Sequence, residues 1–441
     1  MNKHNERVFM RLNNFLKYKA LFFTLLMSVE AIAFAPNNFF PPYDPALHLP
    51  NAPECNPFRI GVNVEWGKGK HSRNLHGKKR NVLQVYDDDQ STLAMIEQPG
   101  PDLLADPDFI ILRDTLRIFG ARDDGVRGHV LFLGRFEQLD VTPHVRYVLP
   151  IDIAGELAIS VALPFRYARV GDISFKDLTL ANGCQDDKTE ELLTQSFDDL
   201  KNLVKKFGNL NLDPWNAHGL GDLAVTLDWS NNYPQDKDGL ENVDLNAFVG
   251  FTAPTGLKKN EDRAFSMAFG HDGAWSIPFG IGLDLDFKYC IAIGGAAHFE
   301  YVFDDTKTRR LKTHESQTEF LLLNKGRATK EHGLLWKFYL YLQAYHFLGG
   351  LSAKAAYEYV KHDDDRLTPK SDNFNASVAN SAKSLEEWNM HHFIFQLNYD
   401  CFKDCSSLCV KPQLSFFYKL PIYGKGIINP QTIGGQIAFN F

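Results

Sequence analysis

Residues 58–66 read Phe-Arg-Ile-Gly-Val-Asn-Val-Glu-Trp, with a large apolar side chain at every second position. Successive side chains of a β-strand point to opposite faces, so this segment would have one apolar face and one polar or small-residue face. A strand that faces lipid on one side and a polar lumen on the other needs this pattern. The segment therefore predicts a membrane-spanning β-strand.

The same alternation recurs along the rest of the chain. It is most regular within residues 156–167, 220–229, 275–286, 334–348, 391–400 and 409–420. Several strand ends carry rings, as expected for the interfacial girdles of a membrane barrel, namely Trp66, Trp229, Tyr301, Phe303 and Tyr359. A soluble β-sandwich also alternates, so the lengths of the connectors must decide between the two folds.

The connectors alternate between long and short when strands are placed at 58–66, 128–150, 156–167, 220–229, 243–253, 275–286, 288–303, 334–348, 351–361, 391–400, 409–420 and 432–441. Residues 128–150 count as one long strand with a bulge near Pro143. Long outer loops and short periplasmic turns are typical of outer-membrane barrels. We therefore expect an all-β fold, a transmembrane antiparallel β-barrel of about 12 strands with small helices in the outer loops. The alternative of about 14 strands needs an extra hairpin formed by 81–86 and 92–97.

Composition excludes other classes of protein. The formal net charge is −7 and the lysines and arginines are scattered, so no nucleic-acid partner is expected. Beyond the N-terminus the chain has no apolar run of about 18 residues or more, which excludes a helical membrane bundle. The mean hydropathy is only −0.27 although 13% of the residues are aromatic. The six cysteines do not show metal-site spacing, and their connectivity stays open.

The N-terminus predicts a secretory signal peptide at residues 1–33. A positively charged region is followed by the apolar stretch 20–29 and by small residues that end at Ala33. Residues 34–57 are rich in proline and predict a periplasmic segment or a plug, and residues 58–441 form the predicted barrel. The expected location is the outer membrane, after removal of the signal peptide.

The last ten residues, Thr432 to Phe441, place Ile433, Ile437, Phe439 and Phe441 on one face. This segment resembles the C-terminal strand by which the barrel assembly machinery recognises bacterial outer-membrane proteins. The resemblance implies that the assembly machinery is a partner of this chain, through the strand that ends in Phe441.

A second resemblance rests on three short motifs. They are Gly219-Leu220-Gly221-Asp222, Pro254-Thr255-Gly256 and His271-Asp272-Gly273-Ala274-Trp275-Ser276. These motifs resemble the outer-membrane proteins associated with meta-pathway phenol degradation, which are similar to long-chain fatty-acid transporters. The resemblance covers about residues 156–303 and implies transport of hydrophobic solutes, although the long, aspartate-rich first loop departs from that pattern.

Function in a barrel resides in the lumen and the loops. The charged residues expected to line the lumen are Arg59, Glu65, Arg166, Asp222, Asp228, Asp284, Asp286, Lys288, Glu300, Lys337, Lys354 and Glu358. Both signs of charge occur among them, so strong ion selectivity is not predicted.

An amphipathic helix is expected in the second long loop, within residues 189–207. Its apolar stripe includes the lid candidates Leu193, Phe197, Leu200 and Val204. The stripe could close the barrel mouth or simply pack against neighbouring loops. The aspartate runs at 87–89 and 363–365 lack the spacing of a calcium loop, so no metal site, cofactor or catalytic residue is predicted.

These features predict an outer-membrane channel or transporter, not an enzyme, for passive passage of small solutes that include hydrophobic ones. The expected partners are outer-membrane lipid and a small-molecule solute. The first alternative is a structural or adhesive barrel. The second is an outer-membrane lipid hydrolase, although the chain lacks a Gly-x-Ser-x-Gly motif.

Overall fold

The computed structural model describes residues 57–97, 99–121, 125, 127–151, 153–178, 196–235, 237–401, 410–428 and 431–441. The predicted signal peptide, nearly all of the predicted segment 34–57 and the lid candidate Leu193 lie outside these residues. Among the residues within them, no helix is both long and apolar enough to cross a bilayer.

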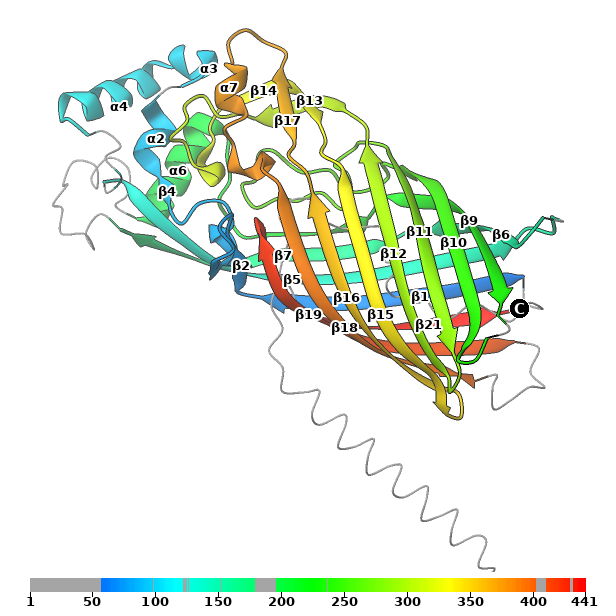
Figure 1. Cartoon of the computed structure of the whole chain (residues 1–441). Coiled ribbons are helices and arrows are strands. Elements are labelled where there is room, and N and C mark those ends of the chain that lie inside the picture. Colours follow the sequence, from blue (N-terminus) through cyan, green and yellow to red (C-terminus); the bar gives the residue numbers. More distant parts are fainter. Residues whose placement is uncertain are drawn as a thin grey trace, which may run out of the picture. The chain divides into compact units, whose positions relative to one another are not determined.

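One antiparallel sheet closes on itself to form a barrel, because β1 pairs with β21 on one side and with β5 on the other (Figure 1). Its strands are β1 (Phe58–Gly69), β5 (His129–Val148), β6 (Glu156–Ala162), β7 (Phe165–Asp177), β8 (Trp215–Leu220), β9 (Leu223–Pro234), β10 (Leu240–Ala253), β11 (Ser276–Phe287), β12 (Ile291–Val302), β15 (Leu335–Leu348), β16 (Leu351–His362), β18 (Trp388–Asp400), β19 (Lys411–Lys425) and β21 (Thr432–Asn440).

Two of the barrel strands are interrupted. β6 and β7 both pair with β5 and are separated only by Leu163 and Pro164, and β8 and β9 are separated by Gly221 and Asp222. Counting each interrupted pair once gives twelve barrel strands, so the prediction of about 12 is confirmed.

The alternative of 14 strands is wrong. Its extra hairpin would use residues 81–86 and 92–97, but these form the 3-10 helix η2 (Val82–Gln84) and the helix α2 (Thr92–Glu97). Asn81 begins η2 with a capping box, in which the Leu83 amide donates to the Asn81 side chain and the Asn81 amide donates to the Gln84 side chain. Local capping and burial of the apolar side chains therefore replace strand pairing in this loop.

The bulge expected near Pro143 lies elsewhere. Pro143 keeps its register opposite Val62 of β1, and the ladder of β5 shifts between Leu133 and Arg135 instead. On its other side, Pro143 faces the break between β6 and β7, where its carbonyl accepts a hydrogen bond from the Leu163 amide. A residue without an amide hydrogen is tolerated there because the facing strand is itself interrupted.

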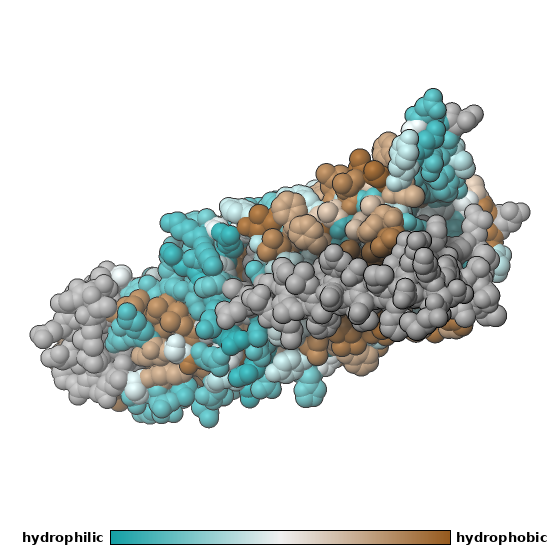
Figure 2. Space-filling view, turned by 90° about the horizontal axis from the view of Figure 1, so that it is seen from below, coloured by the Kyte–Doolittle hydropathy of each residue, from teal (hydrophilic) through white to brown (hydrophobic). Residues whose placement is uncertain are grey.

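The outward side chains of the strands form an apolar wall. Leu340 is 60% exposed and Ile281 is 64% exposed, although both lie mid-strand where a soluble protein would bury them. Figure 2 shows this brown surface along the barrel, with teal side chains gathered toward the ends. A wall of this kind is the lipid-facing surface of a membrane barrel.

The long connectors gather at one end of the barrel and form a cap (Figure 1). Besides η2 and α2 it contains α3 (Pro101–Leu104), α4 (Pro107–Ile118), α6 (Phe197–Gly208), η5 (Glu319–Leu321), α7 (Ala376–Ala379) and η6 (Lys383–Leu385), with β4 (Gln90–Ser91) paired to β5. Two small sheets complete it, β13 (Asp305–Arg310), β14 (Lys325–Glu331) and β17 (Arg366–Pro369), and β20 (Ile427–Ile428), β2 (His71–Arg73) and β3 (Lys79–Asn81).

The opposite end of the barrel has short turns. Tyr289 and Cys290 adopt positive φ angles of 72° and 62° in the turn between β11 and β12. The first and last strands also meet at this end, where the rings of Phe58 and Phe441 lie 6.1 Å apart. Outer-membrane barrels have short turns in the periplasm and long loops outside the cell, so this is the periplasmic end and the cap is extracellular. Cys290 is an exposed free thiol in the turn between β11 and β12, and four of the six cysteines lie outside the described residues.

Replacing Leu340 with arginine tests the lipid-facing wall. A cation on the lipid face near the bilayer midplane should destabilise the folded barrel by about 2–4 kcal/mol. The free energy of unfolding in lipid vesicles, measured by urea titration, checks this value. Leu104→Arg is the matched control, because Leu104 is 48% exposed on α3 of the cap and contacts water. Equal effects of the two substitutions would contradict a lipid-facing position for Leu340.

Candidate functional site

The charged residues that face the lumen are held in pairs between strands. Arg59 donates to Asn440 (2.7 Å) and to Gln413 (3.3 Å). The Lys419 ammonium lies 3.0 Å from Glu65, and the Arg166 guanidinium lies 3.1 Å from Asp140. The Lys419–Glu65 and Arg166–Asp140 pairs neutralise their charges locally, whereas Arg59 is held by two uncharged amide side chains.

A second group of charges spans β11, β15, β16 and β18. The Lys337 ammonium lies 3.2 Å from Glu358, which also contacts His392 at 2.9 Å. The Lys354 ammonium lies 4.1 Å from the ring centroid of Tyr341, whose hydroxyl donates to Asp284. Cation–ring contacts of this kind stabilise a lysine that has lost much of its water.

The remaining predicted lumen residues lie in different surroundings. Asp228 accepts hydrogen bonds from Ser160 and Thr226 on the lumen face of β6 and β9. Asp286 lies on β11 near the periplasmic end, opposite Asn242 of β10. Lys288 lies beyond the end of β11, in a turn, where its ammonium is 3.5 Å from Asp238, so it does not line the lumen as expected.

An aromatic belt, which we define as Phe248, His298, Tyr339, Ile394 and Phe417, crosses the inner face of the barrel. The rings of Phe248 and His298 lie 4.8 Å apart, and those of His298 and Tyr339 lie 5.3 Å apart. Tyr339, Ile394 and Phe417 belong to one buried cluster with Ala356. The belt gives the polar lumen a band that can contact apolar solutes.

The belt was not predicted, because charge alone defined the expected lumen residues. The signal was present in the parity of the strands. Tyr339 shares its face with Lys337, and Phe417 shares its face with Lys419. An aromatic residue in phase with a predicted lumen charge is therefore also a lumen residue.

The lumen is narrow. Arg59, Lys337 and Lys354 are 9%, 6% and 7% exposed, and Glu358 is 2% exposed. Charged side chains that line a wide aqueous channel would be well exposed to water. Twelve strands enclose a lumen between that of a filled eight-stranded barrel and that of an open porin, and here side chains occupy much of it.

One buried carboxylate joins three segments where β8 and β9 are interrupted. Asp222, which is 1% exposed, accepts hydrogen bonds from the backbone amides of Gly256 (2.8 Å) and His271 (2.6 Å). β8 pairs with β7 but not with β10, so side-chain and loop contacts replace the strand ladder here. A β-carbon on Gly270 would lie 2.0 Å from the Asp222 carboxylate, which requires glycine at that position.

Glu300 organises the polar residues next to this interruption. Its carboxylate contacts His271 (2.8 Å) and Ser276 (2.6 Å) through the same oxygen. A Ser–His–carboxylate triad needs the serine hydroxyl on the histidine, whereas here both groups contact the glutamate. This arrangement positions the loop before β11 and does not form a nucleophile.

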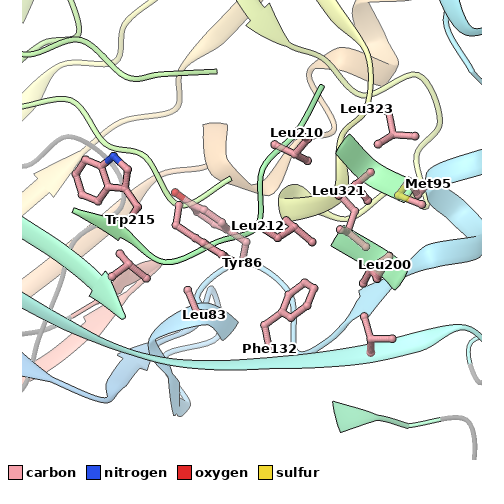
Figure 3. Close-up of a cluster of buried hydrophobic side chains, with 14 of the residues drawn as sticks. Leu83, Tyr86, Met95, Phe132, Leu200, Leu210, Leu212, Trp215, Leu321 and Leu323 are labelled. Atoms are coloured by element: carbon pink, nitrogen blue, oxygen red, sulfur yellow. The ribbon is translucent and has the colours of Figure 1, made fainter. Parts of the chain in front are cut away.

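The cap has a hydrophobic core that continues onto the inner faces of β5, β7 and β8 (Figure 3). Labelled side chains from distant segments meet there, namely Leu83, Tyr86, Met95, Phe132, Leu200, Leu210, Leu212, Trp215, Leu321 and Leu323. Of the predicted lid residues, Leu200 and Val204 are fully buried in this core and Phe197 packs against it, with its ring stacked 5.6 Å from that of Phe175. The apolar stripe of α6 therefore joins the cap to the barrel mouth.

Charged side chains hold together the small β13–β14–β17 sheet of the cap. The buried Asp365 carboxylate lies 2.6 Å from the Lys330 ammonium, and His332 lies 3.1 Å from Asp305. The pKa of His332 is lowered to about 4, because burial disfavours the charged imidazolium. The positive charge of Lys330 lowers this pKa further, whereas the carboxylates of Asp305 and Asp365 raise it.

Within the described part of the chain, no group of His, Cys, Asp and Glu side chains is arranged to hold a metal ion.

Comparison with known proteins identifies the fold. Neither a family model nor a curated protein matches the sequence. The structure is similar to the COG4313 outer membrane channel from Pseudomonas putida F1, with a TM-score of 0.52 and 11% identity over 90% of this chain and 100% of that one. The chain has the outer-membrane β-barrel fold. Its predicted location in the outer membrane follows from this fold.

Two other barrels are more distant in structure. The Pseudomonas putida toluene transporter TodX has a TM-score of 0.32 and 8% identity, over 88% of this chain and 90% of that one. The NanC porin has a TM-score of 0.27 and 9% identity, over 68% of this chain and 93% of that one.

Replacing Asp222 with alanine should loosen the wall next to the interruption. Two backbone amides would lose a charged acceptor, which corresponds to a local destabilisation of about 2–3 kcal/mol. Hydrogen exchange at the amides of Gly256 and His271 should accelerate accordingly. Asp238→Ala, in an exposed periplasmic turn, serves as the control and should leave both amides unchanged. Unaltered exchange in Asp222→Ala would show that other contacts hold this part of the wall.

Acid should open the cap through His332. In the folded cap this imidazole takes a proton only near pH 4, whereas in the opened cap it does so near 6.5, so the opened state binds more protons between these values. The free energy of cap opening is therefore highest above pH 6.5. It falls by up to about 3 kcal/mol as the pH is lowered toward 4.

Hydrogen exchange of the β13 and β14 amides, corrected for intrinsic rates, measures this dependence. His332→Gln should flatten the loss of protection, whereas substitution of the exposed His76 should not. The same pH dependence in His332→Gln and in the wild type would exclude His332 as its source.

Proposed function

We propose that this protein is an outer-membrane channel for the passive passage of small, largely apolar solutes. The observation that carries the proposal is the aromatic belt inside a lumen whose charges are paired. Aromatic and aliphatic side chains bind apolar solutes weakly at several sites, which suits passage better than retention. Paired charges provide no strong selectivity for either anions or cations.

The cap supports a gated rather than a permanently open entrance. Its hydrophobic core continues onto the inner faces of β5, β7 and β8, so the loops fill part of the barrel mouth. The apolar stripe of α6, which comprises Phe197, Leu200 and Val204, is the lid in this proposal. Solutes enter when this stripe separates from the mouth.

The interruption at Asp222 supports a second exit, sideways from the barrel into the bilayer. A regular strand ladder is replaced there by the hydrogen bonds of Asp222 and a few loop contacts. Phe165, Leu220 and Leu257 expose 49%, 37% and 38% of their surface beside it. The transfer of an apolar solute from water into hydrocarbon lowers its free energy, whereas the transfer of a polar solute does not. Asp222→Ala should therefore raise the flux of apolar solutes more than that of polar ones.

Replacing Phe417 with alanine tests the lumen directly. Removal of this ring from the belt should raise single-channel conductance in planar bilayers several-fold and reduce the preference for an uncharged aromatic solute over a charged solute of similar size. Phe416→Ala is a matched control, because Phe416 is the neighbouring residue on the lipid-facing side of β19. Absence of conductance and solute flux in correctly folded wild-type protein would contradict a channel and favour the structural or adhesive alternative.

The lipid-hydrolase alternative has less support. Among the described residues, Ser276 and His271 both contact Glu300 and do not form a triad. Lipase assays on folded, detergent-solubilised protein should therefore give no turnover.

Recognition by the barrel assembly machinery through the strand that ends in Phe441 is part of the same proposal, as for other outer-membrane barrels.

A further inference from the structure

The connector after β1 carries a dense group of positive charges. Between Glu65 and Asp87 the chain contains no acidic residue. It contains six basic residues that we define as the rim patch, namely Lys68, Lys70, Arg73, Lys78, Lys79 and Arg80. The lysines and arginines are scattered over the chain as a whole, but this segment is an exception.

The β2–β3 hairpin brings these charges together. Arg73 lies opposite Lys79 and Ser72 lies opposite Arg80 in its antiparallel ladder. Lys70, Lys78 and Lys79 are exposed and form no ion pair within the part of the chain that the structure describes. Arg80 is the neutralised member, since its guanidinium lies 2.7 Å from the Asp88 carboxylate. The patch therefore presents several uncompensated cations on a single short hairpin.

Two cation–ring contacts fix the level of the patch relative to the membrane. The Lys68 ammonium lies 4.9 Å from the ring centroid of Trp66, and the Arg73 guanidinium lies 5.8 Å from that of Tyr423. Trp66 and Tyr423 are 38% and 47% exposed at the extracellular ends of the lipid-facing wall, where interfacial rings occur. Cations directly above such rings lie at the level of lipid head groups.

A cavity of about 520 Å³ lies within the hairpin and is lined by His71, Lys79, Arg80, Asn81, Gln84 and Asp88. Burial and the charges of Lys79 and Lys70 lower the pKa of His71. The imidazole thus experiences the positive field of the patch directly. An anionic oxygen in this cavity would meet the Lys79 ammonium and the amide groups of Asn81 and Gln84, next to the Arg80–Asp88 ion pair.

We propose that the rim patch binds the phosphate groups of an acylated, phosphorylated glycolipid in the outer leaflet, of the lipid A type. The hairpin supplies cations at head-group level, and the apolar wall of β1 and β21 below it accommodates acyl chains beside Val64 and Ile437. A soluble phosphate compound would match the charges but not the wall. This inference does not depend on the proposed transport function.

Titration of the detergent-solubilised full-length barrel with bis-phosphorylated lipid A tests the proposal. The test variant combines Lys68→Gln, Lys70→Gln, Lys78→Gln and Lys79→Gln. Each cation near a membrane surface contributes enough that loss of four should weaken lipid A binding about tenfold or more. The matched control combines Lys205→Gln, Lys237→Gln, Lys258→Gln and Lys370→Gln, which removes the same charge from exposed sites outside the patch. Anomalous electrophoretic migration before boiling verifies that both variants are folded.

The affinities of the two variants, of dephosphorylated lipid A and of inorganic phosphate decide the proposal. Weaker binding by the test variant alone, together with loss of wild-type binding when lipid A is dephosphorylated, supports the proposal. Equal affinity of the test and control variants overturns it, as does equal affinity for phosphorylated and dephosphorylated lipid. Complete displacement of lipid A by millimolar inorganic phosphate, with no contribution from the acyl chains, identifies a phosphate site and overturns the lipid assignment.

Discussion

The structure depends on one constraint, that backbone amides and carbonyls within hydrocarbon must hydrogen-bond to one another. Each unpaired group there costs several kcal/mol, so the sheet must close. The seam between β1 and β21 completes the ladder and joins the two ends of the barrel sequence. Where proline or a strand break interrupts the ladder, at Pro164 and at Asp222, local contacts take over, and the Asp222 carboxylate is the clearest example.

Closure also determines the chemistry of the lumen. With one face of every strand committed to lipid, the other face must accommodate all the polar side chains, and a lumen of this width brings opposite charges into contact. The Lys337–Glu358–His392 group and the Glu65–Lys419 pair result from this crowding. The aromatic belt occupies the space between these groups, so the lumen can contact apolar solutes without presenting a strong field to ions.

The cap shows how extracellular loops become an ordered structure. Segments from the connectors after β1, β7, β10, β12 and β19 bury one shared hydrophobic core against the top of β5 and β7. Ion pairs such as Lys383–Asp87 connect loops that are far apart in sequence. The same loops include the positive hairpin of the rim patch, so the cap both covers the barrel mouth and carries the charges of the proposed lipid site.

The sequence by itself determined the strands, because the alternation of apolar and polar side chains is a local pattern that does not depend on which distant segments pack against it. It thereby indicated the closed barrel and the lumen face of residues such as Glu65, Lys337 and Lys354. Only the tertiary structure decided their partners: Arg59 bonds to Asn440, 381 positions away, and Asp222 meets His271 across a connector. It also decided that residues 82–84 and 92–97 form short helices within the cap, since burial by distant loops, rather than local pattern, stabilises them.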